Sequence, residues 1–121
     1  MNITSIAPTV NKNAFKWKLT NNSSTHAFVT EVTVSWPNAQ GNIKELKFGK
    51  DKFAEKLNIA PPSHTFTEAD FVSDMKKRRL DSGKTEEFKI RFKSNYNNDI
   101  PNDYSVTITF DTGEVVSFNT P

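Results

Sequence analysis

Apolar and polar residues alternate with a period of two along much of this chain. The clearest stretches are residues 15–19, 28–36, 88–92 and 104–110. Successive side chains of a β-strand point to opposite faces, so this alternation predicts strands with one buried and one solvated face. In the second stretch, we expect Phe28, Val32, Val34 and Trp36 to share the buried face. The pattern indicates an antiparallel, all-β fold.

Turn-forming residues separate these stretches and set the expected architecture. Strands are predicted at residues 14–20, 27–36, 43–48, 85–93, 104–110 and 115–118. Asp111-Thr112-Gly113 links the last two as a bulge hairpin, because Gly tolerates the left-handed conformation. The spacing favours an immunoglobulin-like or fibronectin-III-like sandwich of about seven strands in two sheets. Residues 1–12 are interpreted as an N-terminal arm, and residues 13–121 as a single sandwich domain.

The segment 50–82 interrupts the alternation, and one short helix is predicted within it. Thr67 is the expected N-cap, with Asp70 as its partner in an arrangement like a capping box. Phe71 and Met75 would then share one helical face at a spacing of four residues. The basic run 76–79 would follow at the C-terminal end, where cations oppose the helix dipole.

Composition indicates a core built from aromatic rings. Hydrophobic residues make up only 35% of the chain, but aromatic residues reach 12%, with ten Phe and two Trp. Large rings can fill the space between two sheets with few residues. The candidate core aromatics are Phe15, Trp17, Trp36, Phe88, Phe92, Tyr104 and Phe110.

Composition also excludes several kinds of site. The chain contains no Cys, which rules out disulfides, thiolate metal sites and a Cys nucleophile. His26 and His64 lie in separate predicted loops without metal-ligand spacing, so no metal site and no cofactor are predicted. The net charge of +2 is too small to predict a specific nucleic-acid partner. No apolar run is long enough to span a membrane, and the first residues lack the pattern of a signal peptide.

The order of strand and turn motifs resembles a small β-sandwich domain of bacterial exported proteins, some of which are pilin-like surface proteins. The resemblance covers about residues 14–118 and rests on motifs of core aromatics, turns and strand ends. These are residues 17–23 (Trp-Lys-Leu-Thr-Asn-Asn-Ser), Trp36-Pro37 with Gly41, Pro61-Pro62, Arg79 with Gly83, residues 88–92, and Tyr104 to Gly113. Two features depart from the family pattern: Glu114 stands where members often carry Cys, and the apolar N-terminal helix or export signal of many members is absent.

The resemblance implies a non-enzymatic, exported bacterial domain with a structural or interaction role. Such a domain would lie outside the cell or at its surface, as a component of a pilin-like filament or an adhesive appendage. Its partners would be other protein subunits or a cell-surface polymer. No catalytic residue follows from the resemblance. An N-terminal arm can add a strand to another subunit's sheet, and Ile3, Ile6 and Val10 are its candidate contacts.

Basic residues on the polar side of two predicted strands form a candidate binding face. If the strands lie in one sheet, their side chains make a cationic surface that could contact an anionic polymer. The alternative is a solvated outer face that discourages edge-to-edge pairing. The candidate residues are Lys16, Lys18, Lys89, Arg91 and Lys93, with Lys76, Lys77, Arg78 and Arg79 as an extension.

A second function class remains open at this point, a carbohydrate-binding module for an anionic or neutral glycan. Tyr96 and Phe66 are its candidate glycan contacts, because neither ring has a clear strand phase. The Asn-rich loop 95–103 leaves calcium binding open, although its two carboxylates are few for that ion.

Overall fold

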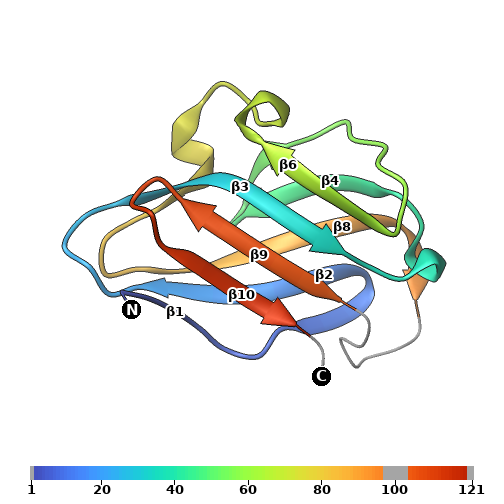
Figure 1. The fold of residues 1–121 in the computed structure, drawn as a ribbon, viewed down its shortest axis with the longest axis horizontal. Helices are drawn as coiled ribbons and strands as arrows, with labels where there is room; N and C mark the ends of the chain where they lie inside the picture. The colour runs from blue at the N-terminus through green and yellow to red at the C-terminus, as the bar shows by residue number, and fades with distance from the viewer. Residues whose placement is uncertain (1, 97–103, 120–121) are drawn as a thin grey trace.

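Two antiparallel sheets pack face to face in the computed structural model, which confirms the predicted all-β sandwich (Figure 1). The structure describes residues 2–96 and 104–119, without the side chains of Asn11, Asn95 and Tyr96. Ten strands lie within these residues, more than the seven expected. The additional strands are two to five residues long, too short to produce a readable alternation.

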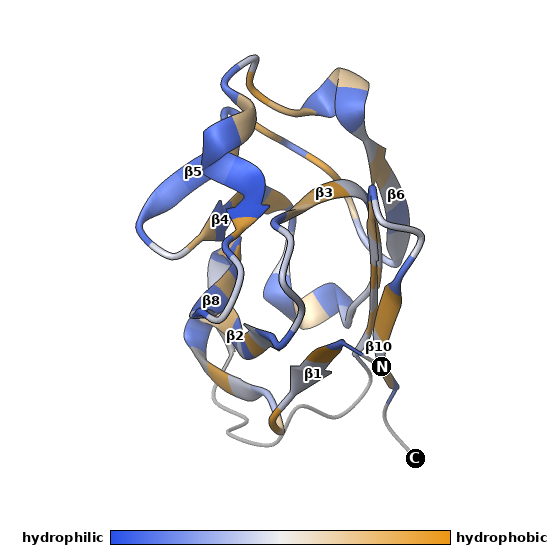
Figure 2. Cartoon of the chain, turned by 90° about the vertical axis from the view of Figure 1, so that its left-hand side faces the viewer, coloured by the Kyte–Doolittle hydropathy of each residue, from blue (hydrophilic) through white to orange (hydrophobic). Residues whose placement is uncertain are grey.

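Each sheet combines strands from distant parts of the chain. The first sheet has the order β1 (Ile3–Ser5), β2 (Thr9–Asn21), β8 (Thr85–Tyr96), β4 (Ile43–Phe48) and β5 (Asp51–Ala54). The second has the order β10 (Val115–Asn119), β9 (Ser105–Phe110), β3 (Ala27–Ser35) and β6 (Ser63–Thr67), with β7 (Arg79–Leu80) also paired to β3. Figure 2 shows the two layers from the side, with β2, β4, β5 and β8 in one and β6 and β10 in the other.

Aromatic rings from both sheets meet between the layers. Phe15 of β2 lies 5.6 Å from Tyr104, which precedes β9, and Trp17 lies 6.5 Å from Phe118 of β10 (centroid distances). Such tilted and edge-on pairs contribute ~0.5–1.5 kcal/mol beyond the burial of their area. The structure buries all seven candidate core aromatics to 2% exposure or less.

One prediction within β3 is wrong, and a β-bulge is the reason. Phe28 was expected on the core face, but it is only half-buried, whereas Val29 is fully buried. The register between β3 and β9 shifts between Val29 and Glu31. The extra residue of a bulge reverses which side chains face inward. Val32, Val34 and Trp36 are buried as expected.

The insertion 50–82 contains two short 3₁₀ segments in place of the predicted helix. The first (η2, Glu68–Asp70) has the predicted capping box, in which the Thr67 N–H donates to Asp70 Oδ2 at 3.0 Å. Phe71 then adopts an extended conformation, which ends the segment. The second (η3, Met75–Arg78) begins after Asp74. Phe71 is therefore buried while Met75 is 46% exposed, so the prediction that they share a face is wrong.

The first twelve residues are part of the sandwich and do not form a free arm. β1 pairs with the end of β2, and β2 itself begins at Thr9. Ile3 and Val10 are buried in the core, so neither is available to another subunit as predicted. Ile6 follows β1 and is 62% exposed.

Two buried polar residues, in or beside the motifs on which the family resemblance rests, hold turns together. Asn21, which is fully buried, donates from Nδ2 to the carbonyls of Thr25 and Leu80 and accepts from Ser23. Gln40 lies in the short η1 (Asn38–Gln40) and accepts a hydrogen bond from the Tyr104 hydroxyl at 2.6 Å. These groups satisfy buried polar atoms and so define the strand connections. Their role in the fold is structural.

Candidate functional site

Four lysines on four neighbouring strands form a row across the outer face of the first sheet. The register places Lys16 of β2 opposite Lys89 of β8, and Lys89 opposite Lys47 of β4. Lys47 is in turn opposite Lys52 of β5. Adjacent strands lie ~4.8 Å apart, so the backbones of neighbouring lysines in the row are one strand spacing apart.

This arrangement has an electrostatic cost. Like charges directly opposite each other on paired strands destabilise a sheet. Partial burial lowers the pKa of Lys89, and the nearby Lys16, Lys47 and Arg91 lower it further, with only Glu87 acting in the opposite direction. The protein therefore holds a half-buried lysine among positive charges at the centre of an exposed sheet face.

The row belongs to a larger cationic face, formed by half of the sixteen Lys and Arg residues of a chain whose net charge is only +2. We use this name for the side chains of Lys16, Lys18, Lys44, Lys47, Lys52, Lys89, Arg91 and Lys93. The sequence singled out the five members on β2 and β8. It missed Lys44, Lys47 and Lys52, although Lys47 is the polar residue between Leu46 and Phe48 in a strand that had been predicted.

Glu45 is the main acidic group within the cationic face. Its side chain is 8% exposed and lies 3.1 Å from Arg91 and 3.2 Å from Lys52. Burial alone would raise the pKa of this carboxyl, but the hydrogen bonds and charges of Lys52 and Arg91 outweigh that effect and hold the pKa below its ordinary value. Glu45 is consequently ionised at neutral pH and positions the Arg91 guanidinium.

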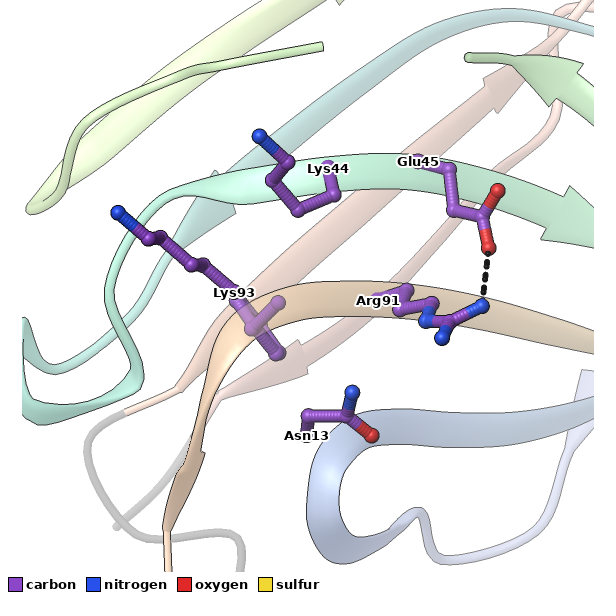
Figure 3. Close-up of a pocket in the computed structure, with 6 residues that line it drawn as sticks. Asn13, Lys44, Glu45, Arg91 and Lys93 are labelled. Carbon is purple, nitrogen blue, oxygen red and sulfur yellow. Dashed lines mark hydrogen bonds and ion pairs between the residues drawn. The ribbon is translucent and has the colours of Figure 1, made fainter. Parts of the chain in front are cut away.

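A shallow hollow of about 310 Å³ lies at one end of the cationic face. Figure 3 shows Lys44 and Lys93 extending from β4 and β8 on one side of it, with the Arg91–Glu45 pair on the other. Asn13 of β2 adds an amide group from below. The charged groups that line the hollow are three cations and one carboxylate, Glu45, so its net charge is positive and suits an anionic ligand.

The predicted extension of the basic face at residues 76–79 is not formed by all four of its residues. Arg78 is buried, pairs with Glu68 at 2.9 Å and lies over the ring of Phe71, so the prediction that it is a surface contact is wrong. Arg79 hydrogen-bonds to Asp81. Lys76 and Lys77 line a different polar pocket with Asp51 and Glu86. Acidic groups there compensate their charge.

The predicted glycan-contacting rings receive no support. Phe66 is fully buried in β6, facing the core between Thr65 and Thr67, so its predicted surface role is wrong. The side chain of Tyr96 lies outside the described residues, as does most of the loop 95–103 that raised the question of calcium.

Two further kinds of feature, a metal site and a membrane-spanning helix, are not found among the described residues. No group of three or more His, Asp or Glu side chains there could hold a metal ion. No helix of that part of the chain has the length and apolar character needed to cross a membrane.

Comparison with known proteins shows a similarity in how the backbone folds, but not in sequence. No protein-family model matches the sequence, and no curated protein matches it. Among solved structures, one similar chain belongs to the archaellum periplasmic stator protein complex FlaF and FlaG from Sulfolobus acidocaldarius. It is 18% identical, with a TM-score of 0.48, over 98% of this chain and 87% of that one. A likeness at this level says nothing about what the present chain does.

Proposed function

We propose that this protein is a non-enzymatic interaction domain that binds an acidic polysaccharide through its cationic face. The observation that carries the proposal is the lysine row from Lys16 to Lys52. Placing like charges opposite one another costs stability in the free protein. A polyanion lying along the row would turn that repulsion into attraction.

The shape of the face supports a polymer as the ligand. The cationic face spans four strands, whereas the hollow beside Arg91 is small and open. A small anion would engage only the hollow and would not contact Lys16, Lys47 or Lys89. An extended chain with repeated negative charges can cross β2, β8, β4 and β5 and contact both.

The side chains favour a polysaccharide over a nucleic acid. Seven of the eight cations are lysines, which are strongly hydrated point charges on flexible stems. Arginine dominates where phosphate is recognised in a bidentate manner. The face also has no exposed aromatic ring among its described residues, whereas binders of single-stranded nucleic acid stack bases on such rings.

Export and location follow only from the family resemblance and belong to this proposal. We propose that the domain acts at a bacterial cell surface, where acidic polysaccharides are accessible, as part of a filament or adhesive structure. This role combines the two functions that the sequence left open, an interaction domain and a glycan-binding module. The structure favours binding through charge and not through ring stacking.

The proposal can be tested with labelled polygalacturonate as the probe. Binding is measured by fluorescence anisotropy at an ionic strength of about 0.01 M and again at about 0.15 M, where the Debye length falls from ~30 to ~8 Å. The test variant carries Lys16→Gln, Lys47→Gln and Lys89→Gln. If each contact is worth ~0.5–1 kcal/mol, the three changes should weaken binding roughly 10- to 100-fold.

A matched control separates the face from the total charge. Lys76→Gln, Lys77→Gln and Lys84→Gln remove the same number of exposed charges elsewhere on the chain. We expect this control to bind within a factor of about three of the unmodified protein. The three lysines that it removes lie off the path of the ligand, and salt screens their attraction at a distance. Equal loss in both variants, or no binding of polygalacturonate at low salt, would contradict the proposal. Stronger binding to duplex DNA than to polygalacturonate would assign the face to a nucleic acid instead.

A further inference from the structure

Strand β10 forms an open edge of the sandwich. Its outer side makes no backbone hydrogen bond to any other described part of the chain. The strand Val115–Asn119 carries no charged residue, no Pro and no bulge in its pairing with β9. Native proteins usually protect an edge with one of these features, because an open edge can pair with another strand.

The hydrogen bonds between β9 and β10 determine which backbone N–H and C=O groups of β10 point away from the sheet. The Phe110 N–H donates to the Glu114 carbonyl at 2.9 Å, which identifies these two as a hydrogen-bonded pair across the hairpin. Hydrogen-bonded pairs alternate along an antiparallel ladder, so Val116 and Phe118 bond to β9. The N–H and C=O groups of Val115, Ser117 and Asn119 therefore point away from the sheet.

The other three edges are shorter, charged or partly blocked. β1 has only three residues. β5 carries Lys52 and is covered by the segment between η2 and η3, where the Val72 N–H donates to the Phe53 carbonyl at 2.7 Å. β6 follows two prolines, and its last N–H, at Thr67, is taken by Asp70.

We infer that β10 pairs antiparallel with β10 of a second copy of this chain. A symmetric pair centred on Ser117 places each Ser117 opposite its counterpart and Val115 opposite Asn119. This arrangement places no charged residue opposite its own copy. Pairing two copies through their β5 edges would instead bring like charges together. Val115, one of the large exposed hydrophobic residues of the described chain, lies on this strand.

The pairing has a consequence for the cationic face. The two-fold axis of an antiparallel strand pair is perpendicular to the sheet, so the first sheets of both copies lie on the same side of the joined second sheets. The two cationic faces then point in one direction. A polymer that contacts both gains affinity through effective concentration, without a new contact.

The oligomeric state tests the inference, and it is measured without any polyanion so that its outcome is independent of the proposed function. Sedimentation equilibrium at concentrations up to about 1 mM covers the weak association expected of an interface below ~1,200 Å². The full chain should approach twice its monomer mass. Ser117→Lys places two like charges opposite each other and should return the mass to that of the monomer. The matched change Thr65→Lys, on the outer face of the β6 edge, should leave the dimer intact.

Cysteine cross-linking keeps the inference testable if Ser117→Lys fails to fold. Opposed residues of a hydrogen-bonded pair have Cα atoms ~5.5 Å apart, within the 4.4–6.8 Å range of disulfides. Because the chain has no Cys, Ser117→Cys provides a single thiol and should cross-link under mild oxidation, whereas Thr65→Cys should not. A monomer at the highest concentration, equal dissociation by both Lys variants, or equal cross-linking by both Cys variants would overturn the inference.

Discussion

The two outer faces of the sandwich are both formed by antiparallel strands, but they expose different kinds of side chain. The first sheet exposes the cationic face, with its row of opposed lysines. The second exposes a hydroxyl face, which we define by the outward Ser and Thr side chains of its four main strands. One row there places Thr33 opposite both Thr65 and Thr107, and Thr107 opposite Ser117.

The difference lies in how the side chains of neighbouring strands interact. Hydroxyl pairs on the second sheet contact each other, as in Thr33–Thr65 and Thr107–Ser117, both at 3.2 Å. Thr–Thr and Thr–Ser pairs across strands are favourable in themselves. Opposed lysines repel each other, and the proposed polyanion would relieve this repulsion. Four changes can break or sharpen this comparison.

The largest effect is expected from copying the lysine row onto the hydroxyl face. Thr33→Lys, Thr65→Lys and Thr107→Lys together create two opposed pairs of like charge and remove favourable hydroxyl contacts. The free energy of unfolding should fall by ~1–3 kcal/mol, measured by urea denaturation. A second site for polygalacturonate should appear in the binding stoichiometry. Unchanged stability would mean that lysine opposition is harmless in this sheet.

The next effect concerns Glu45, the carboxylate that compensates Arg91 and Lys52. Glu45→Gln should lower the free energy of unfolding at pH 7 by ~1 kcal/mol, because both ion pairs are lost while their cations remain half-exposed. Its depressed pKa means that the unmodified protein keeps this contribution above pH 4.5 and loses it as pH falls through the folded-state pKa.

The acid limb of the unfolding curve therefore provides the readout for this residue. The Glu45→Gln variant should show a shallower loss of stability below pH 4.5, and its affinity for polygalacturonate should rise because two cations are released. Identical acid limbs in both proteins would indicate that these ion pairs contribute nothing measurable.

A smaller effect, of opposite sign, is expected at the centre of the row. Lys89→Gln should raise the free energy of unfolding at pH 7 by ~0.2–1 kcal/mol, because it removes repulsion from Lys16 and Lys47. The lowered pKa of Lys89 also predicts that the unmodified protein gains stability as pH rises between its folded-state pKa and 10.5. The variant should lack that gain. A destabilised variant would indicate that the stem of Lys89 contributes more through packing than its charge costs.

The smallest effect is expected on the hydroxyl face. Thr33→Val and Thr107→Val, made singly, should change the free energy of unfolding by no more than ~0.5 kcal/mol, since these are surface positions in strands that favour both residues. Polygalacturonate binding should stay unchanged. A loss of binding in either variant would move the ligand site to the second sheet.

The sequence predicted the sandwich and five of the eight residues of the cationic face for one physical reason. Alternation with a period of two reports which side chains of a strand share a face, so Lys16, Lys89 and Arg91 were identified correctly as outward residues of two strands. Their pairing was assumed and not predicted, because register depends on contacts between segments distant in sequence. Lys47 and Lys52 join the row only through that register.

The errors arose where local patterns were overridden by packing. A bulge in β3 moved Phe28 from the core face to a half-buried position. The run 76–79 looked like a uniform cationic segment, but Arg78 turns inward to Glu68 and Phe71. Phe66 lacked a clear strand phase because β6 has only five residues. A bulge or a short edge strand leaves too few residues for any periodic signal.

The central pairing of β2 with β8 has a consequence for folding and synthesis. These strands come from opposite ends of the chain, and such non-local pairing is slow, because a long loop must close before any contact compensates for the lost entropy. By contrast, the β9–β10 hairpin is local in sequence. The lysine row is therefore absent from a nascent or partly folded chain and arises only when the last third of the protein joins the first. A ligand of the row would bind the native state alone and stabilise it by mass action, so recognition would also report that folding is complete.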